Sequence, residues 1–277
     1  MKTKTIQQYQ VDAFTDRIFG GNPAAVVPLE REWLPTATMQ AIAMENQLSE
    51  TAFFVQQDDG FALRWFTPTV EVDLCGHATL ASAHVLFEEL AFARERIVFH
   101  GELGELIVTR HERGYAMDFP IDTIGADREP AEAISAAIGA PVEEVFRGRH
   151  DLMAVLAEER LIRELRPSIP AIASLDARGL LVTAPGDETD FVSRCFFPRT
   201  GIDEDPVTGS AHTTMSPYWG KRLGKEELRA RQLSKRIGDL ICRVGEERVV
   251  LIGNAVTFSR GAIAIPEDET GAVGIDE

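Results

Sequence analysis

The chain contains few cysteines, and their spacing is irregular. Only Cys75, Cys195 and Cys242 occur among its 277 residues, and an odd, unevenly spaced set argues against a disulfide framework. These thiols and the six histidines show no pair at the spacing of a zinc site, and no HExxH segment is present. We therefore expect a reducing compartment, the cytoplasm, and a site without a metal.

Long apolar runs and an excess of positive charge are also absent. No stretch holds the roughly 18 consecutive apolar residues of a membrane-spanning helix, and the segment MKTKTIQQYQVDAF lacks the apolar centre of a signal peptide. Acidic residues outnumber basic ones by 44 to 28, which gives a formal net charge of −16. Because this balance opposes contact with nucleic-acid backbones and anionic membranes, neither is expected as a partner.

Motifs for nucleotides and for activated serines are missing as well. The sequence has no Walker A segment, no GxGxxG after a strand and no GxSxG turn. Catalysis by side chains alone, without a cofactor, is the expectation that remains. The length and the 44% apolar content allow one large domain, or two of ordinary size, with a full core.

One short pattern occurs once in each half of the chain. Segments 73–78 (DLCGHA) and 205–211 (DPVTGSA) each precede an apolar stretch and place a glycine, Gly76 or Gly209, where a helix is expected to begin. A helix start offers unpaired N–H groups and the positive end of the helix dipole, which attract anions. We therefore expect two lobes that face a common cleft and hold a small carboxylate there.

Hydrophobic periodicity and turn residues place these motifs among helices and strands. Helices are expected at 35–46, at 78–90 and from the second motif to about Leu223. Segments 49–55 and 61–66 are expected to form a hairpin across the polar turn between them. Pro217 lies inside the third helix, so that helix either bends or has a different boundary.

Three charged or titratable side chains are the main candidates for acid–base chemistry. Glu45 ends the first helix and would serve as a general base if partial burial raised its pKa. It is one of 44 acidic residues, most of them solvated, and Glu50 competes with it for the role. His77 follows Gly76, where anion contact or proton transfer is favoured. Asp205 lies in an acidic cluster, and crowding of like charges raises the pKa of a carboxyl group.

Three further residues have both a structural and a functional interpretation. Asp73 either caps the first helix or contacts a ligand. Ser210 either caps the second helix, the simpler interpretation, or binds a carboxylate. Cys75 stands at a helix start, where a thiol has a lowered pKa and can act as a nucleophile or base. A buried bystander thiol is the equal alternative.

Four segments together carry a family resemblance. They are GNPAAV at 21–26, ENQLSET at 45–51, DLCGHAT at 73–79 and DPVTGSAH at 205–212. In this order and over essentially the whole chain, they resemble the PhzF-like isomerases of phenazine biosynthesis. The resemblance implies the α+β fold of diaminopimelate epimerase, with two pseudo-symmetric lobes, each a curled, mostly antiparallel sheet around a central helix. We expect an N-terminal lobe over 1–119 and a C-terminal lobe over 120–277, with the last strand able to return to the first lobe.

The resemblance also implies an isomerase that uses neither a cofactor nor a metal. Glu45 is taken as the residue that matches the family's catalytic acid/base, and His77 and Asp205 match positions that assist catalysis or contact the substrate. The substrate carboxylate is expected at Gly76, Gly209 and Ser210, with Asp73 and Cys75 beside it. A homodimer is also expected from the resemblance.

The chain departs from the related epimerases and racemases at one position. Those enzymes place a cysteine at each helix start, whereas here Cys75 matches the first and Pro206 and Val207 stand near the second. We therefore expect a carboxylate-based proton shift on a small carboxylate-bearing substrate. An amino-acid racemase that pairs Cys75 with Asp205 or Glu45, and a non-catalytic ligand-binding relative, are the alternatives.

Overall fold

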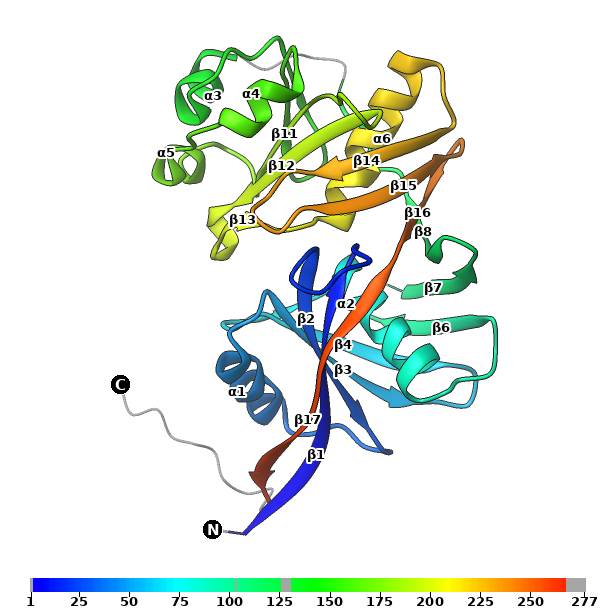
Figure 1. Ribbon diagram of the computed structural model, residues 1–277. Helices are drawn as coiled ribbons and strands as arrows, with labels where there is room; N and C mark the ends of the chain where they lie inside the picture. Colours follow the sequence, from blue (N-terminus) through cyan, green and yellow to red (C-terminus); the bar gives the residue numbers. More distant parts are fainter. Residues whose placement is uncertain (1, 103, 126–130, 268–277) are drawn as a thin grey trace.

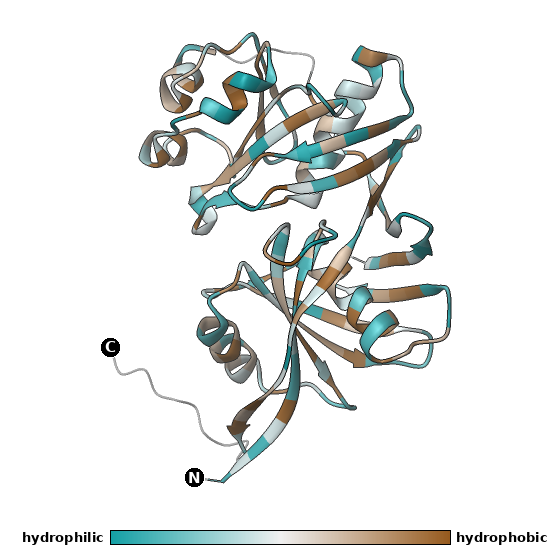
Figure 2. Cartoon of the chain, viewed as in Figure 1, coloured by the Kyte–Doolittle hydropathy of each residue, from teal (hydrophilic) through white to brown (hydrophobic). Residues whose placement is uncertain are grey.

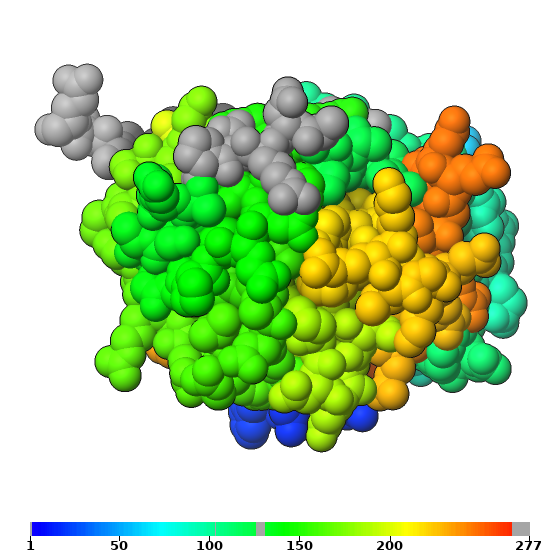
Figure 3. Space-filling view, turned by 90° about the horizontal axis from the view of Figure 1, so that it is seen from above, coloured from blue at the N-terminus to red at the C-terminus, as the bar shows by residue number. Residues whose placement is uncertain are grey.

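The computed structural model describes residues 2–102, 104–125 and 131–267. Its elements gather into two parts, one below the other in Figure 1. The connecting strand β8 (Gly114–Pro120) pairs with β7 (Gly104–His111) of the first part and with β16 (Arg248–Gly253) of the second. Seen from above, the second half of the chain covers most of the first, which emerges at the margins (Figure 3).

The first part is a curved sheet around one buried helix. Its other strands are β1 (Thr3–Ala13), β2 (Asn22–Leu29), β3 (Glu50–Gln56), β4 (Phe61–Phe66), β5 (Glu71–Val72) and β6 (Arg96–Gly101). Helix α2 (Gly76–His84) is buried from His77 to His84 and continues into the π-helical turn η1 (Val85–Glu89). Helix α1 (Thr36–Asn46) covers the other face of β3 and β4 (Figure 1).

The second part contains further strands and more of the helices. Its strands are β9 (Glu144–Arg147), β10 (Leu152–Val155), β11 (Leu180–Pro185), β12 (Phe191–Phe197), β13 (Ile202–Asp205), β14 (Glu227–Gln232), β15 (Gly238–Val244) and β16. Helix α6 (Gly209–Leu223) packs on β14, β15 and β16. The shorter helices are α3 (Ala131–Ile138), α4 (Glu159–Glu164) and α5 (Ile169–Ala173), with a 3-10 turn η2 (Pro198–Thr200). Of these, α4 and α5 contact β12.

Helix α6 runs through Pro217 without ending there. A proline has no N–H group to donate, so the carbonyl four residues earlier loses its helical partner. That carbonyl belongs to Thr213, and it accepts a hydrogen bond of 3.3 Å from the backbone N–H of Asp122 instead. The predicted boundary at Leu223 is thus correct, and a neighbouring segment satisfies the group that the proline leaves unpaired.

The last described strand returns to the first part of the molecule. Strand β17 (Ala255–Pro266) pairs antiparallel with β1 along its whole length, with one bulge after Gln10 (Figure 1). The chain therefore passes between the two parts twice, through β8 and through the junction of β16 and β17. The division after residue 119 stays a prediction.

The two central helices share one hydrophobic core. Leu80 of α2 and Met215 of α6 are fully buried members of the same apolar cluster, while separate clusters lie under α1 and under α3 to α5. Apolar residues accordingly follow the sheet and the inner sides of its helices in Figure 2. The fold is mixed α/β, with helices at 36–46 and 76–84 close to their predicted places. Among the described helices, none is long and apolar enough to cross a bilayer.

Candidate active site

The two predicted helix starts meet at the junction of the two parts. A Cβ atom added to Gly76 would lie 3.5 Å from the Cα of Gly209, and one added to Gly209 would lie 3.5 Å from the Cα of Gly76. The N-cap residues Cys75 and Thr208 make no side-chain capping hydrogen bond. The positive ends of two helix dipoles therefore face one small region without a local capping side chain to neutralise them.

Glu45 does not reach this region. It is exposed near the end of α1, which lies on the flank of the first part, away from the junction (Figure 1). The structure therefore does not give Glu45 the partial burial that was expected of a general base. The helix ends at once after it, because Gln47 adopts a left-handed conformation (φ 50°) that turns the chain into β3.

Glu50 occupies the place that Glu45 was expected to take. It is the first residue of β3, a strand buried on both faces up to Val55, and the residue as a whole is only 8% exposed. The parallel pairing of Glu50 with Ala24 of β2 fixes its position in the sheet. Its Oε2 atom lies 3.2 Å from Nε2 of the buried His77.

Burial shifts the protonation of both partners toward the neutral forms. Desolvation, followed by repulsion from Asp205, raises the pKa of Glu50 to about 8, against a smaller lowering effect of a Cys75 hydrogen bond. Desolvation lowers the pKa of His77 to about 3. Near pH 7 the close approach of Glu50 and His77 is therefore a contact between largely uncharged groups, and not an ion pair.

Asp205 approaches Glu50 and His77 from the second part of the molecule. These three residues, with Cys75 and Asn22, are called the buried cluster below. Its carboxylate accepts hydrogen bonds from Asn22 Nδ2 (2.7 Å) and from the Thr208 hydroxyl. Burial raises its pKa to about 6, although these two hydrogen bonds lower it. Gln232 of β14 holds the turn before α6, since it donates to the Asp205 carbonyl and accepts from the Thr208 N–H.

Cys75 is a neutral thiol in this environment. Its Sγ atom lies 3.5 Å from Nδ1 of His77, and burial first, then the charge of Glu50, raises its pKa well above the usual value. The expected lowering by the helix start is thus wrong, because desolvation and nearby carboxylates outweigh the dipole. The buried-thiol alternative fits the structure.

Glu50, Cys75 and His77 also form a group of metal-ligating side chains. Their donor atoms lie within 4.8 Å of one another. The carboxylate approaches Nε2 of the imidazole, however, and the thiol approaches Nδ1. Because one ion binds only one of these two nitrogens, these two contacts do not place all three donor atoms around one shared metal ion.

The remaining predicted residues lie at the edge of the cluster. Asp73 is exposed, and no hydrogen bond or ion pair found in the described residues ties it to the site. Neither Asp73 nor Ser210 caps a helix, since Cys75 and Thr208 hold those positions. Ser210 is half-buried in the first turn of α6, beside Gly209.

Three polar atoms in the cluster are buried and have no hydrogen-bond partner. They are Asn22 Oδ1, Glu50 Oε2 and His77 Nε2. Buried polar atoms are nearly always paired in folded proteins. Their concentration beside two helix starts, together with shifted pKa values, is typical of a place where a ligand completes the network.

Sequence reasoning gave no role to two buried amides of this site, Asn22 and Gln232. Asn22 lies in the GNPAAV segment, one of the four motifs, but the motif does not indicate what its side chain does. Gln232 carries no local signal, because only the pairing of β14 with β15 brings it under the turn at Asp205. For Glu50, the available signal was an acidic residue directly before a run of apolar strand residues.

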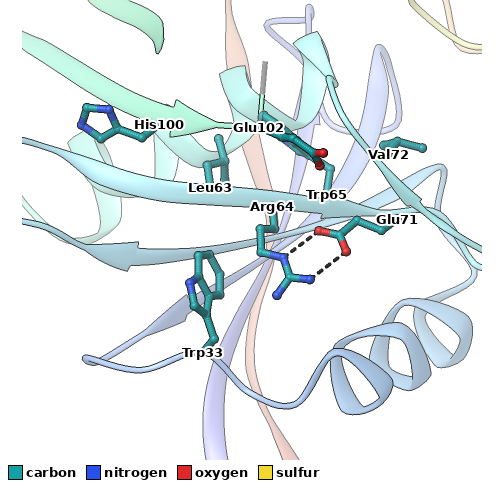
Figure 4. Close-up of a pocket in the computed structure, with 8 residues that line it drawn as sticks. All are labelled: Trp33, Leu63, Arg64, Trp65, Glu71, Val72, His100 and Glu102. Atoms are coloured by element: carbon teal, nitrogen blue, oxygen red, sulfur yellow. Dashed lines mark hydrogen bonds and ion pairs between the residues drawn. The ribbon is translucent and has the colours of Figure 1, made fainter. Parts of the chain in front are cut away.

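An open pocket of about 320 Å³ lies elsewhere, beside β4, β5 and β6 (Figure 4). Its cation, Arg64, is already held by both carboxylate oxygens of Glu71 at 2.6 and 2.7 Å. The guanidinium also lies 5.4 Å from the ring centre of Trp33. Because the charge of Arg64 is neutralised and one face of its guanidinium is covered, this pocket has fewer groups available for catalysis than the buried cluster.

Comparison with known proteins places the chain among close relatives. Residues 11–261 match the family model described as phenazine biosynthesis-like protein. An uncharacterized isomerase of Pseudomonas aeruginosa is 46% identical over 260 residues, covering 94% of this chain and 99% of the relative. The crystal structure of a PhzF-family protein from Enterococcus faecalis is 48% identical, with a TM-score of 0.90 and coverage of 94% and 99%.

A more distant likeness extends to the epimerases. A hydroxyproline epimerase from Agrobacterium vitis, solved with bound trans-4-hydroxy-L-proline, has a TM-score of 0.58 at 10% identity. The superposition covers 94% of this chain and 93% of the epimerase. At that identity the likeness concerns the fold alone.

Proposed function

The chain belongs to the phenazine biosynthesis-like protein family, and we propose that it is a cofactor-independent isomerase that moves a proton on a small carboxylate-bearing substrate. The acid/base is Glu50, in place of Glu45. The observation that carries this proposal is the burial of Glu50 beside His77, with its Oε2 atom unpartnered at 3.2 Å from Nε2. That burial is also the main cause that raises the pKa of Glu50 to about 8. A general base works best when its pKa lies near the working pH.

The proposed reaction is a shift of one proton between two carbons. Ionised Glu50 accepts a proton from a carbon next to the conjugated system, and the C–H electron pair moves into that system. Glu50 then returns the proton to another carbon of the same system, so no atom or electron is gained or lost. N–H groups at the helix starts of Gly76 and Gly209 bind the substrate carboxylate and stabilise the negative charge that develops.

His77 and Asp205 assist from the two sides of the junction. His77 is neutral near pH 7, so it donates or accepts a hydrogen bond without adding a charge to a dry site. Asp205, with a pKa near 6, is ionised in most molecules at pH 7 and orients polar groups of the substrate. Buried charges of this kind act strongly because little water screens them.

The proposal is tested by solvent exchange with a panel of small acids. Cyclic and acyclic amino and hydroxy acids are incubated with the protein in deuterated water, and label uptake into carbon positions is measured by mass spectrometry. Uptake into at least one acid, catalysed by the protein, is the expected result. Binding of panel acids with no uptake into any of them would favour the non-catalytic relative instead.

The racemase alternative depends on Cys75, and the contact of its thiol with His77 keeps it open. Because burial holds the thiol neutral, we expect Cys75→Ala to keep turnover within about tenfold of the wild type. The matched control is Cys242→Ala, which removes another fully buried thiol. Loss of exchange in Cys75→Ala alone would transfer the catalytic role to the thiol.

A further inference from the structure

Asn22 is the buried amide at the centre of the cluster. It is the first residue of β2, pairs with Ala13 of β1 and is fully enclosed. The preceding Gly21 has a φ of +57°, and a Cβ there would lie 2.0 Å from the Ala13 carbonyl oxygen. Only glycine fits that position, so the backbone that presents Asn22 is tightly defined.

A residue of the second part of the molecule clamps this backbone. Arg236 donates to the Gly21 carbonyl (2.9 Å) and the Gly20 carbonyl (2.8 Å), and it also pairs with the buried Asp12 (2.7 Å). The Gly21 N–H donates to the Ile237 carbonyl at 2.8 Å. Asn22 is therefore placed jointly by both parts of the molecule, at the junction where the helix starts meet.

The surroundings of the Asn22 side chain define its orientation. Its Nδ2 atom lies 2.7 Å from Asp205 Oδ1, 2.9 Å from the Val207 carbonyl and 3.2 Å from His77 Nδ1. The carboxylate and the carbonyl can only accept hydrogen bonds, so the NH₂ group must point toward them. The amide oxygen is thereby left on the other side, where it is buried without a partner.

This orientation also determines the proton position on His77. An NH₂ group has two hydrogens to share among its three neighbours and cannot accept a hydrogen bond, so a proton on the facing Nδ1 atom would point at a donor, and the neutral imidazole is favoured with Nδ1 unprotonated. The single ring proton is then on Nε2, the nitrogen that faces Glu50. The Cys75 thiol lies 3.5 Å from the same nitrogen.

We propose that Asn22 is a positioning residue that holds His77 as the Nε2–H tautomer, aligns Asp205 with it, and offers its amide oxygen to an N–H or O–H donor of the substrate. The first two tasks follow from contacts within the protein. The third rests on the proposed function, and it adds a feature to the substrate class: a hydrogen-bond donor near the carboxylate. An unpaired buried acceptor is costly, which gives a ligand with that donor an advantage over one without it.

The tautomer is tested without any substrate. Ring nitrogen NMR of ¹⁵N-histidine-labelled wild type at pH 7, with His77→Gln used to assign the signals, is expected to show a protonated Nε2 and an unprotonated Nδ1. In Asn22→Asp the new carboxylate can accept a hydrogen bond from Nδ1–H, so the ring proton is expected to move to Nδ1. The matched control is Asn46→Asp, which changes a half-buried amide that hydrogen-bonds to Gln8 and Thr51. The ring nitrogen signals of His77 should not change in this variant.

The amide oxygen is tested with two planar carboxylates that differ at one atom. Pyrrole-2-carboxylate carries a ring N–H donor, and furan-2-carboxylate carries an oxygen in its place. By calorimetry, the wild type is expected to bind the pyrrole about tenfold more tightly. Asn22→Ala is expected to bind the two equally, and Asn46→Ala is expected to keep the preference.

The possible outcomes separate this proposal from the proposed function. A wild-type His77 protonated on Nδ1, or on both nitrogens at pH 7, overturns the tautomer assignment whether or not the protein is an isomerase, and this result needs no variant. Equal wild-type binding of the two acids, or binding of neither at millimolar concentration, overturns the role of the amide oxygen. Deuterium uptake that persists alongside either result leaves the isomerase proposal standing.

Discussion

Glu50→Gln is expected to abolish deuterium uptake, lowering turnover by at least about 10²- to 10⁴-fold. The amide cannot accept the proton that the reaction removes from carbon, while its size and hydrogen-bonding capacity remain close to those of the acid. Turnover is measured as label incorporation at saturating substrate, and binding of the same substrate is measured separately. We expect binding to change little, because in the proposed site the helix starts, and not Glu50, hold the carboxylate of the substrate.

Glu45→Gln is the matched control for this experiment. It makes the same chemical change in the same sequence segment, but at an exposed side chain outside the cluster. Its turnover is expected to stay within about twofold of the wild type, as is usual for surface substitutions. Loss of uptake in Glu45→Gln with full activity in Glu50→Gln would return the catalytic role to the first glutamate and contradict the site described above.

Glu50→Gln is also expected to stabilise the protein increasingly as the pH rises from 5 to 8. In the unfolded chain Glu50 loses its proton near pH 4.5, whereas in the folded protein it keeps the proton until about pH 8. Across this interval the unfolding free energy of the wild type falls by about 1.4 kcal/mol for each pH unit because of Glu50, up to a total on the order of 3–5 kcal/mol. Glutamine does not titrate, so the variant does not lose this stability as the pH rises.

The measurement is the difference in unfolding free energy between the two proteins in urea at several pH values. The difference should be small below pH 4.5, grow between pH 5 and 8 and level off above 8. Asp205 and His77, whose pKa values are also shifted by burial, are present in both proteins, so their own burial contributes about equally to each. The repulsion between Asp205 and Glu50 is part of the measured difference. The same series with Glu45→Gln should be flat, and a flat series for Glu50→Gln would mean that this carboxyl group is not desolvated.

Much of the architecture follows from local sequence signals. The glycine segments at 73–78 and 205–211 predicted two helix starts, and α2 and α6 begin at Gly76 and Gly209. Apolar periodicity placed α1 within one residue of its observed start and placed β4 correctly. These features depend on interactions between neighbouring residues, such as turns, helix starts and the burial of one face, and a single sequence contains them.

The choice between Glu45 and Glu50 could not be made in this way. Both lie in one short segment, and either becomes buried if the chain turns differently between helix and strand. The left-handed conformation at Gln47 and the pairing of Glu50 with Ala24 decide the outcome. The pKa of Glu50 is raised first by burial and then by repulsion from Asp205, a residue far away in the sequence.

Local sequence signals were enough to indicate two glycine-led helix starts accompanied by His77 and Asp205, and to show that no disulfide framework or nucleotide motif is available for the chemistry. The packing of the folded chain was needed to show which glutamate is buried beside them, that the Cys75 thiol stays protonated, and that Asn22 connects His77 to Asp205. The difference arises because helix starts are short-range properties of the chain. Desolvation and electrostatic coupling, by contrast, depend on how closely distant segments pack.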